Sequence, residues 1–182
     1  MAFNLQEFKG EFQLEGARPT LFQVELQFPV ALGIGDASRK LTFTCKAAQL
    51  PGVTTGVIEV PYFGRKIKVA GDKTFQEWTI TVINDEDFAV RNSFEIWQRG
   101  INSHVGNVRY DPAYKSVDAR IRQFAKDGSD VPSAEYTMVG VWPSDISPID
   151  VSWESNDAIE EFTVTMNYDW WENEYIGIDS NN

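Results

Sequence analysis

The sequence is poor in the residues that build most catalytic and metal centres. Its 182 residues include one cysteine, Cys45, and one histidine, His104. A single cysteine excludes an internal disulfide, which fits assembly in a reducing cytoplasm. A single histidine excludes metal sites and proton relays that need several histidines. We therefore expect no cofactor, and we expect stability to come from the core and from interfaces.

Long apolar runs are also missing. The longest uncharged segment, Ala47–Ile58, is interrupted by Pro51, Gly52 and Gly56, so it is too short and too broken to span a membrane. The N-terminus alternates charged and apolar residues, a pattern that predicts no signal peptide. We expect a single domain over residues 1–182 without membrane insertion.

Positive charge is absent from the last third of the chain. Residues 127–182 hold thirteen Asp or Glu and no Lys or Arg, whereas residues 1–126 hold fourteen acids and sixteen bases. The net charge of −11 argues against general affinity for nucleic acid. Two interpretations stay open: a solvated acidic surface, or a surface that must not adhere to a polyanion.

Alternating apolar and polar residues predict a mainly antiparallel β fold, with one face of each strand in a core. The alternation runs through Phe22–Phe28, Leu41–Cys45, Trp78–Val82, Val117–Ile121 and, longest of all, Phe162–Trp170. Cys45 falls on the apolar side of its segment and is interpreted as a small core residue. Shorter candidate strands are 57–60, 67–70, 136–142 and 149–153.

One amphipathic helix is predicted over about residues 85–99. Asn84 or Asp85 is a suitable N-cap, and Gly100 suits the end of the helix. An apolar stripe that we expect to pack on the sheet is formed by Phe88, Val90, Phe94 and Trp97.

Motifs for chemistry are weak. The segment Val69–Phe75 resembles the end of a phosphate-binding loop, but Gly64 and Gly71 are too far apart and Asp72 would repel a phosphate. A calcium site at Asp127, Asp130 and Glu135 lacks the spacing of a known loop. Six Trp and six Tyr permit a sugar-binding platform, although most of the Trp lie in strand-like segments. The sequence therefore predicts no enzyme.

Threonine rather than lysine occupies the second face of three predicted strands, at Thr42 and Thr44, Thr79 and Thr81, and Thr163 and Thr165. Threonine suits a sheet surface of low charge. Two interpretations stay open for these faces: solvent exposure, or a sheet that is continued by neighbouring subunits or lines a channel.

Longer segments carry a resemblance to a known family. ARPTLFQVELQF, FTCKAAQLPG, VPYFGRKIKVAGDKTFQEWTITVINDED, FEIWQ, VWP, SWESN and FTVTMNYDWWE resemble the tail tube protein of contractile-tailed bacteriophages. The similarity runs from about residue 17 to 172, and its block 50–87 is long and specific. Residues 28–40 are interpreted as a lengthened hairpin connection and residues 173–182 as a flexible extension.

The resemblance implies a rolled antiparallel β-sandwich with a flanking helix and a long protruding hairpin. It implies a structural virion protein, assembled in the host cytoplasm into hexameric rings that stack into a tube inside a contractile sheath. The implied partners are other copies of the chain, the sheath protein, the baseplate initiator, the tape-measure protein and the tail terminator. Genome DNA would pass through the lumen without specific binding.

The resemblance also suggests roles for particular residues. The hairpin between rings would have its tip at Leu50, Pro51, Gly52, Val53, Thr54, Thr55 and Gly56, and its return arm would carry Arg65, Lys66, Lys68 and Lys73 toward acidic groups of a neighbour. Gly71-Asp72 would turn the chain into the next strand. The candidates for a lumen or inter-subunit face are the six threonines above with Glu161 and Asp169. Two alternatives remain: the inner tube of a phage-derived injection particle, and a carbohydrate-binding module of a fibre.

Overall fold

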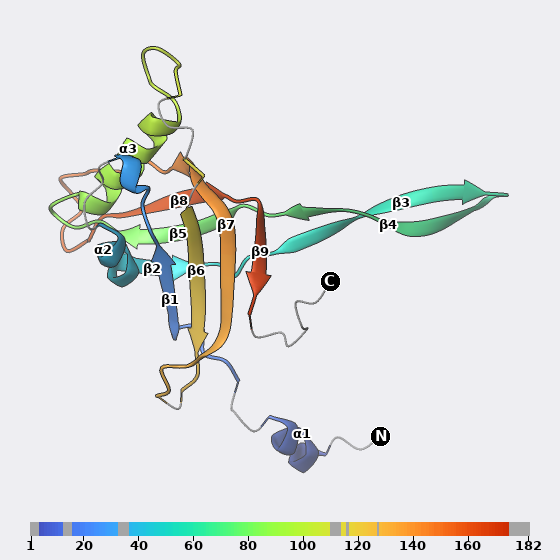
Figure 1. Cartoon of the computed structure of the whole chain (residues 1–182). Helices are drawn as coiled ribbons and strands as arrows, with labels where there is room; N and C mark the ends of the chain where they lie inside the picture. Colours follow the sequence, from blue (N-terminus) through green and yellow to red (C-terminus); the bar gives the residue numbers. More distant parts are fainter. Residues whose placement is uncertain are drawn as a thin grey trace.

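The structure is a computed structural model that describes residues 4–12, 16–32, 37–109, 114–115, 117–126 and 128–174 (Figure 1). Its helices are α1 (Leu5–Glu11), α2 (Ala37–Thr44) and α3 (Ala89–Ile101), with a short 3₁₀ turn, η1 (Val30–Leu32). Its strands are β1 (Phe22–Leu26), β2 (Cys45–Ala48), β3 (Val53–Tyr62), β4 (Arg65–Phe75), β5 (Trp78–Ile83), β6 (Val117–Phe124), β7 (Pro132–Ile146), β8 (Glu161–Asn167) and β9 (Trp170–Asn173).

The strands form a rolled antiparallel sheet, as expected. The order is β1-β6-β7-β8-β5-β2, and β9 pairs with β7 beside β8. The first part of β7 pairs with β6 and β9, while its last residues pair with β8 (Figure 1). The long strand β7 therefore belongs to both layers and lets one sheet fold over itself.

The predicted strand Phe162–Trp170 is broken into β8 and β9, which run in succession along β7. The break lies opposite Gly140, whose φ of +69° is a left-handed conformation, and the Asp169 N–H donates to the Val139 carbonyl at 2.9 Å. A Cβ at Gly140 would lie 2.7 Å from an Asp169 carboxylate oxygen. Glycine is therefore required at the point where β7 changes partners.

The core confirms the alternation of β1, β5, β6 and β8. Its buried residues include Val24, Leu26, Trp78, Ile80, Val82, Ala119, Ile121, Phe162, Val164 and Met166. Helix α3 covers this core with Val90, Phe94 and Trp97, as predicted. Phe28 contacts both aromatic rings of the helix, at centroid distances of 5.0 Å and 5.9 Å.

Phe88 does not belong to that apolar stripe, contrary to the prediction. Its side chain is exposed, because α3 begins at Ala89 and Phe88 takes a left-handed N-cap conformation with φ of 52°. The helix therefore starts four residues later than expected. The helix also runs through Gly100, which is buried; a Cβ there would lie 2.6 Å from the Leu32 side chain.

The predicted strand at residues 41–45 is wrong. Residues 37–44 form α2, and the strand begins only at Cys45. The buried residues Ala37 and Leu41 are four apart and face β1 and α3, whereas Phe43 is exposed. The alternation of Leu41, Phe43 and Cys45 therefore does not mark one buried face. The buried side of this segment is marked by Ala37 and Leu41, which have the spacing of a helix.

Three further interpretations need correction. Residues 149–153 form no strand, and Trp153 is fully exposed, because they belong to a loop that leaves the body between β7 and β8. The described part of residues 28–40 forms η1 and the start of α2 rather than a hairpin connection. Asn173 ends β9 and Glu174 donates its N–H to the Glu135 carbonyl, while residues 175–182 lie outside the described residues.

Candidate assembly surfaces

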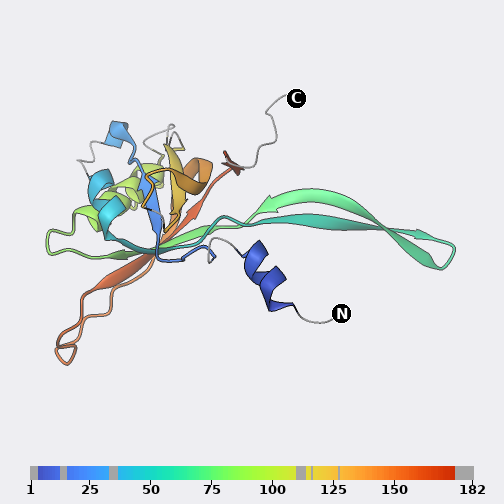
Figure 2. The ribbon, with the colours of Figure 1, turned by 90° about the horizontal axis from the view of Figure 1, so that it is seen from below.

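A long hairpin, β3–β4, projects from the body (Figure 2). It continues the pair formed by β2 and β5, and every residue of β3 is exposed. An arm of ten residues extends about 33 Å at the usual rise of a strand. Its turn is Phe63-Gly64, where both residues have positive φ, the pattern of a type I′ turn.

The hairpin tip was therefore predicted at the wrong place. Leu50–Gly56 lies at the base, where the Gln76 N–H donates to the Gly52 carbonyl and the Trp78 indole donates to the Gln49 carbonyl at 2.7 Å. Gly71-Asp72 is not a turn but an irregularity within β4 opposite Gly56. A Cβ at Gly71 would lie 3.2 Å from the Gly56 backbone, so these glycines allow the arms to approach and twist. Glycine favours a bulge as well as a turn, so Gly56 does not by itself mark the tip of a hairpin.

The two faces of the hairpin differ. The strand register places Ile58, Val60, Ile67 and Val69 on one side, which we call the apolar face. The other side, the charged face, carries Glu59, Lys66 and Lys68. Lys66 pairs with Glu59 at 2.6 Å, so this lysine is already paired within its own hairpin. Lys73 lies beyond the bulge, opposite Thr55, and Arg65 lies at the tip, opposite Tyr62.

A second surface is the outer face of β5 and β8. Thr79 lies opposite Thr165 and Thr81 lies opposite Thr163, so the four threonines share one half-buried patch. Thr42 and Thr44 do not belong to it. They lie on α2, where their hydroxyls donate to the carbonyls of Ser38 and Lys40 one turn earlier.

The two acidic candidates are ion-paired. Glu161 is on the side of β8 that carries the threonines, and it pairs with Lys46 at 2.5 Å. Asp169 lies between β8 and β9 and pairs with Lys115 at 2.7 Å. Basic residues from the first 126 positions thus neutralise part of the acidic C-terminal third, a pairing that the linear charge count does not reveal.

Glu135, one of the three acids whose spacing does not fit a calcium loop, is a buried structural residue. It accepts a hydrogen bond from Arg122 at 2.8 Å, and Arg122 also pairs with Glu25 at 2.5 Å. The hydrogen bond that Arg122 donates to Glu135 raises the pKa of Arg122. Asp127 lies outside the described residues. Within the described ranges, no group of three His, Cys, Asp or Glu side chains is placed to hold a metal ion.

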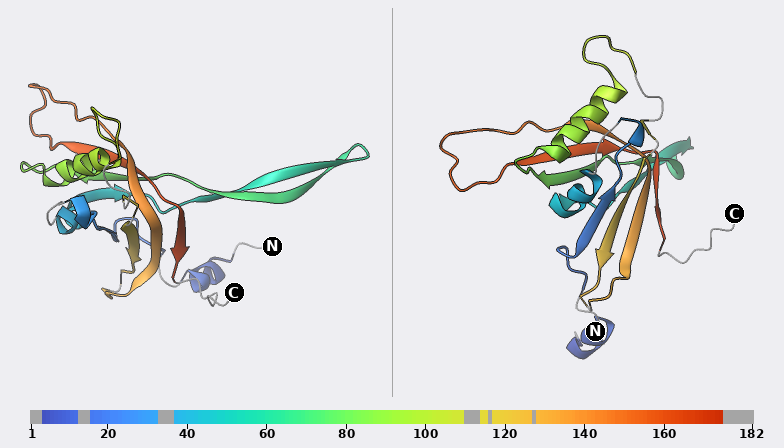
Figure 3. Two further views of the ribbon diagram at one scale, coloured as in Figure 1. Left: turned by 45° about the horizontal axis from the view of Figure 1, so that its top comes forward. Right: turned by 60° about the vertical axis from the view of Figure 1, so that its left-hand side comes forward.

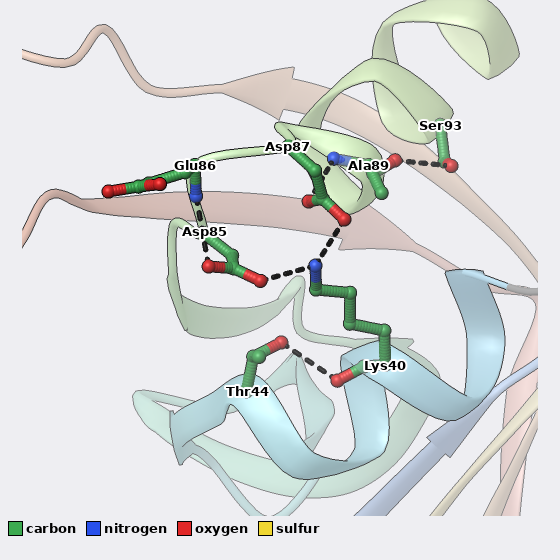
Figure 4. Close-up of polar contacts among 7 residues, drawn as sticks. All are labelled: Lys40, Thr44, Asp85, Glu86, Asp87, Ala89 and Ser93. Atoms are coloured by element: carbon green, nitrogen blue, oxygen red, sulfur yellow. Dashed lines mark hydrogen bonds and ion pairs between the residues drawn. The ribbon is translucent and has the colours of Figure 1, made fainter.

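Sequence patterns also missed a polar cluster that joins α2 to the start of α3 (Figure 4). Lys40 contacts Asp85 and Asp87, each at 2.5 Å, and Asp87 accepts a hydrogen bond from the Ala89 N–H. The hydrogen bonds from Lys40 are the largest cause that lowers the pKa of both carboxyl groups. The same two hydrogen bonds raise the pKa of Lys40. The cluster depends on the helical conformation of residues 37–44, which the alternating pattern at 41–45 does not predict.

Cys45 resembles a structural thiol. It is partly buried at the start of β2 and packs against the core, and burial raises its pKa to about 12. A thiol with so high a pKa is a poor nucleophile at neutral pH.

No helix among the described residues has the length and apolar character needed to cross a membrane.

Comparisons with known proteins agree with this architecture. The family model described as "Phage tail tube protein" matches residues 17–174. The tail tube proteins gp19 of Enterobacteria phages T4 and T6 are each 40% identical to this chain over 158 residues, which cover 86% of this chain and 91% of each relative. This family is a structural one rather than a class of enzymes.

Solved structures share the fold at low sequence identity. The cap that terminates the tube of the anti-feeding prophage has a TM-score of 0.62 at 14% identity, with 87% of this chain and 91% of that chain covered. A chain of the sheath–tube complex of an extracellular contractile injection system has a TM-score of 0.54 at 14% identity, with 95% and 99% covered. The family match and the 40% identity together show that this chain belongs to the phage tail tube protein family, as a structural component of the virion tail.

Proposed function

We propose that this chain polymerises as hexameric rings that stack into the inner tube of a contractile tail, and that the β3–β4 hairpin joins one ring to the next. The observation that carries the proposal is the hairpin itself, which leaves the body and exposes both faces. A two-stranded hairpin is at best marginally stable alone in water. A partner that covers it supplies the missing contacts.

The proposal extends to the other components of such a tail. The sheath protein surrounds the tube, the baseplate initiator and the tail terminator contact its ends, and the tape-measure protein occupies its lumen during assembly in the host cytoplasm. Genome DNA then passes through the lumen without specific binding.

The half-buried threonine patch of β5 and β8 is our candidate for the lumen wall. DNA carries about one negative charge per 1.7 Å, and Lys or Arg on a wall would bind it through counterion release. Hydroxyl groups with a neutralised Glu161–Lys46 pair provide few charges to hold a passing polyanion.

Shortening the hairpin tests the stacking role. Deleting residues 58–61 and 66–69 together removes four opposed pairs and keeps the Phe63-Gly64 turn in register. The melting temperature of the body should stay near wild type, because β3 contributes nothing to the core. Tube elongation, followed by negative-stain microscopy in the presence of the baseplate initiator, should fail.

Charge removal is the matched control. Lys66→Gln with Lys68→Gln leaves the hairpin length intact and should shorten tubes only mildly, because exposed ion pairs contribute about 0–1 kcal/mol each. Tubes of normal length from the shortened chain would contradict the stacking role.

A further inference from the structure

The apolar face of the hairpin is an unpartnered sheet surface. Ile58, Val60, Ile67 and Val69 are exposed by 46% to 57%, although these residue types are normally buried. At the tip, Phe63 is 92% exposed and contacts the Tyr62 ring at a centroid distance of 4.7 Å. Apolar residues thus continue along one face to the end of the hairpin.

A second apolar surface lies in the loop of residues 147–160, between β7 and β8. Val151, Trp153 and Ile159 are exposed by 81%, 102% and 72%. A tryptophan with its whole surface in water is unusual in a monomer and is typical of an interface anchor. We call this segment the tryptophan loop.

The charges of these two surfaces are complementary. Of the four bases on the hairpin arms, Arg65 has the register of the apolar face, where it lies opposite Tyr62 and in line with Ile67 and Val69. The tryptophan loop carries Asp150, Glu154, Asp157 and Glu160 and no base. Opposite charge at the rim of apolar patches favours their encounter and sets their orientation.

The two surfaces also leave the body in opposite directions. The hairpin and the loop point to opposite sides in both views of Figure 3, as they do in Figures 1 and 2. One chain therefore cannot join its own hairpin to its own loop. A contact between different surfaces of two copies is heterologous, and a repeated contact of that kind propagates an open assembly.

We propose that the apolar face of the hairpin docks on the tryptophan loop of a second copy, with the charged face turned to solvent. This inference rests on the stacking role proposed above and specifies it: the apolar face, rather than the lysines, holds the neighbour. Glu59 and Lys66 satisfy each other and can stay hydrated.

Cysteine cross-linking on assembled tubes tests the contact. In a Cys45→Ser background, chains with Ile58→Cys are mixed with chains with Ser155→Cys, which keeps Trp153 in the same loop, and oxidised. The matched control replaces Ile58→Cys by Glu59→Cys, the adjacent residue on the charged face. A disulfide needs Cβ atoms about 3.5–4.5 Å apart, so the apolar-face pair should give about tenfold more linked dimer.

Matched double variants provide a second measurement. Ile58→Ser with Val69→Ser changes one opposed pair on the apolar face, and Glu59→Ser with Lys68→Ser changes the next pair on the charged face. The apolar pair should raise the critical concentration for elongation about tenfold or more, because each buried side chain contributes to binding. The charged pair should change it less than about twofold. Trp153→Ala should act like the apolar pair.

The outcomes separate this inference from the stacking role. If the shortened hairpin blocks tube elongation but Ser155→Cys links to neither face, or equally to both, the docking inference is wrong and the stacking role stands. If the chain with the shortened hairpin forms tubes of normal length, the stacking role is wrong, and the docking inference is wrong with it.

Discussion

At the scale of single residues, Trp97 shows how one side chain fastens a helix to the sheet. It is completely buried, contacts Phe28, and donates its indole N–H to the Tyr114 carbonyl at 3.2 Å. Its removal leaves both a cavity and a carbonyl without that donor.

Trp97→Ala should therefore lower the free energy of unfolding by about 3–5 kcal/mol, the usual range for a buried aromatic residue. Chemical denaturation of the unassembled chain measures this difference. Phe88→Ala, at the exposed start of the same helix, is the control and should cost much less. A loss below about 1 kcal/mol for Trp97→Ala would contradict the packing described here.

Lys40 provides a residue-scale prediction about pH. Because the folded pKa of Asp85 and of Asp87 lies below the ordinary value of 3.8, their pairing stabilises the fold above about pH 4. That contribution is lost as the pH falls through the folded values. Lys40→Met should return both carboxyl pKa values toward 3.8, which a carboxyl NMR titration measures.

The same variant should also change how stability depends on pH. The melting temperature of Lys40→Met should lie below that of wild type at neutral pH, and the difference should shrink below pH 4. Lys9→Met, on the exposed helix α1, is the control and should alter neither carboxyl. Unchanged titration of Asp85 and Asp87 would show that Lys40 is not their partner.

At the scale of elements, the irregular stretch of β4 sets the shape of the hairpin. Gly71→Ala places a methyl group 3.2 Å from the backbone of Gly56. Because β3 and β4 are paired along their length, one arm cannot shift away from this methyl group without disturbing the other. We expect a changed twist, fewer long tubes and an unchanged melting temperature of the body. Gly10→Ala, with no atom within 4 Å of the added Cβ, is the control for both measurements, microscopy and thermal unfolding. Normal tubes from Gly71→Ala would show that the close approach is dispensable.

At the scale of the whole molecule, the threonine patch leads to a prediction about the rate at which DNA leaves through the tube. Thr163→Lys with Thr165→Lys adds two positive charges per subunit to the proposed lumen wall, and the ring repeats them. Genome ejection should slow by about tenfold at low salt and recover as salt screens the attraction.

The control for that prediction adds the same charge elsewhere. Val131→Lys with Ser133→Lys changes two exposed positions near the start of β7. These particles should eject DNA at the wild-type rate. Ejection kinetics that are equally slow for both variants would remove the lumen assignment, since the effect would then depend on net charge alone.

The sequence by itself determined the β class, the strands β1, β5 and β6 and the buried stripe of α3. These features depend on the spacing of apolar residues that lie two to four positions apart. That spacing indicates which side of a helix or strand is buried. The seven segments that resemble tail tube proteins were also enough to suggest the family, since a resemblance from about residue 17 to 172 does not depend on locating any side chain in space.

Only the tertiary structure decided where the hairpin turns, that residues 37–44 form a helix, and which acids are paired. Phe63-Gly64 makes the turn because the pairing of the two arms continues up to Tyr62 and Arg65. The local sequence signal for a turn is stronger at Pro51, Gly52 and Gly56, which lie at the base of the hairpin. Residues 37–44 are helical because α2 packs against β1 and α3, which lie elsewhere in the chain, and buries Leu41. Glu161 meets Lys46 across 115 positions. Each of these outcomes depends on partners far apart in sequence, so no local pattern contains them.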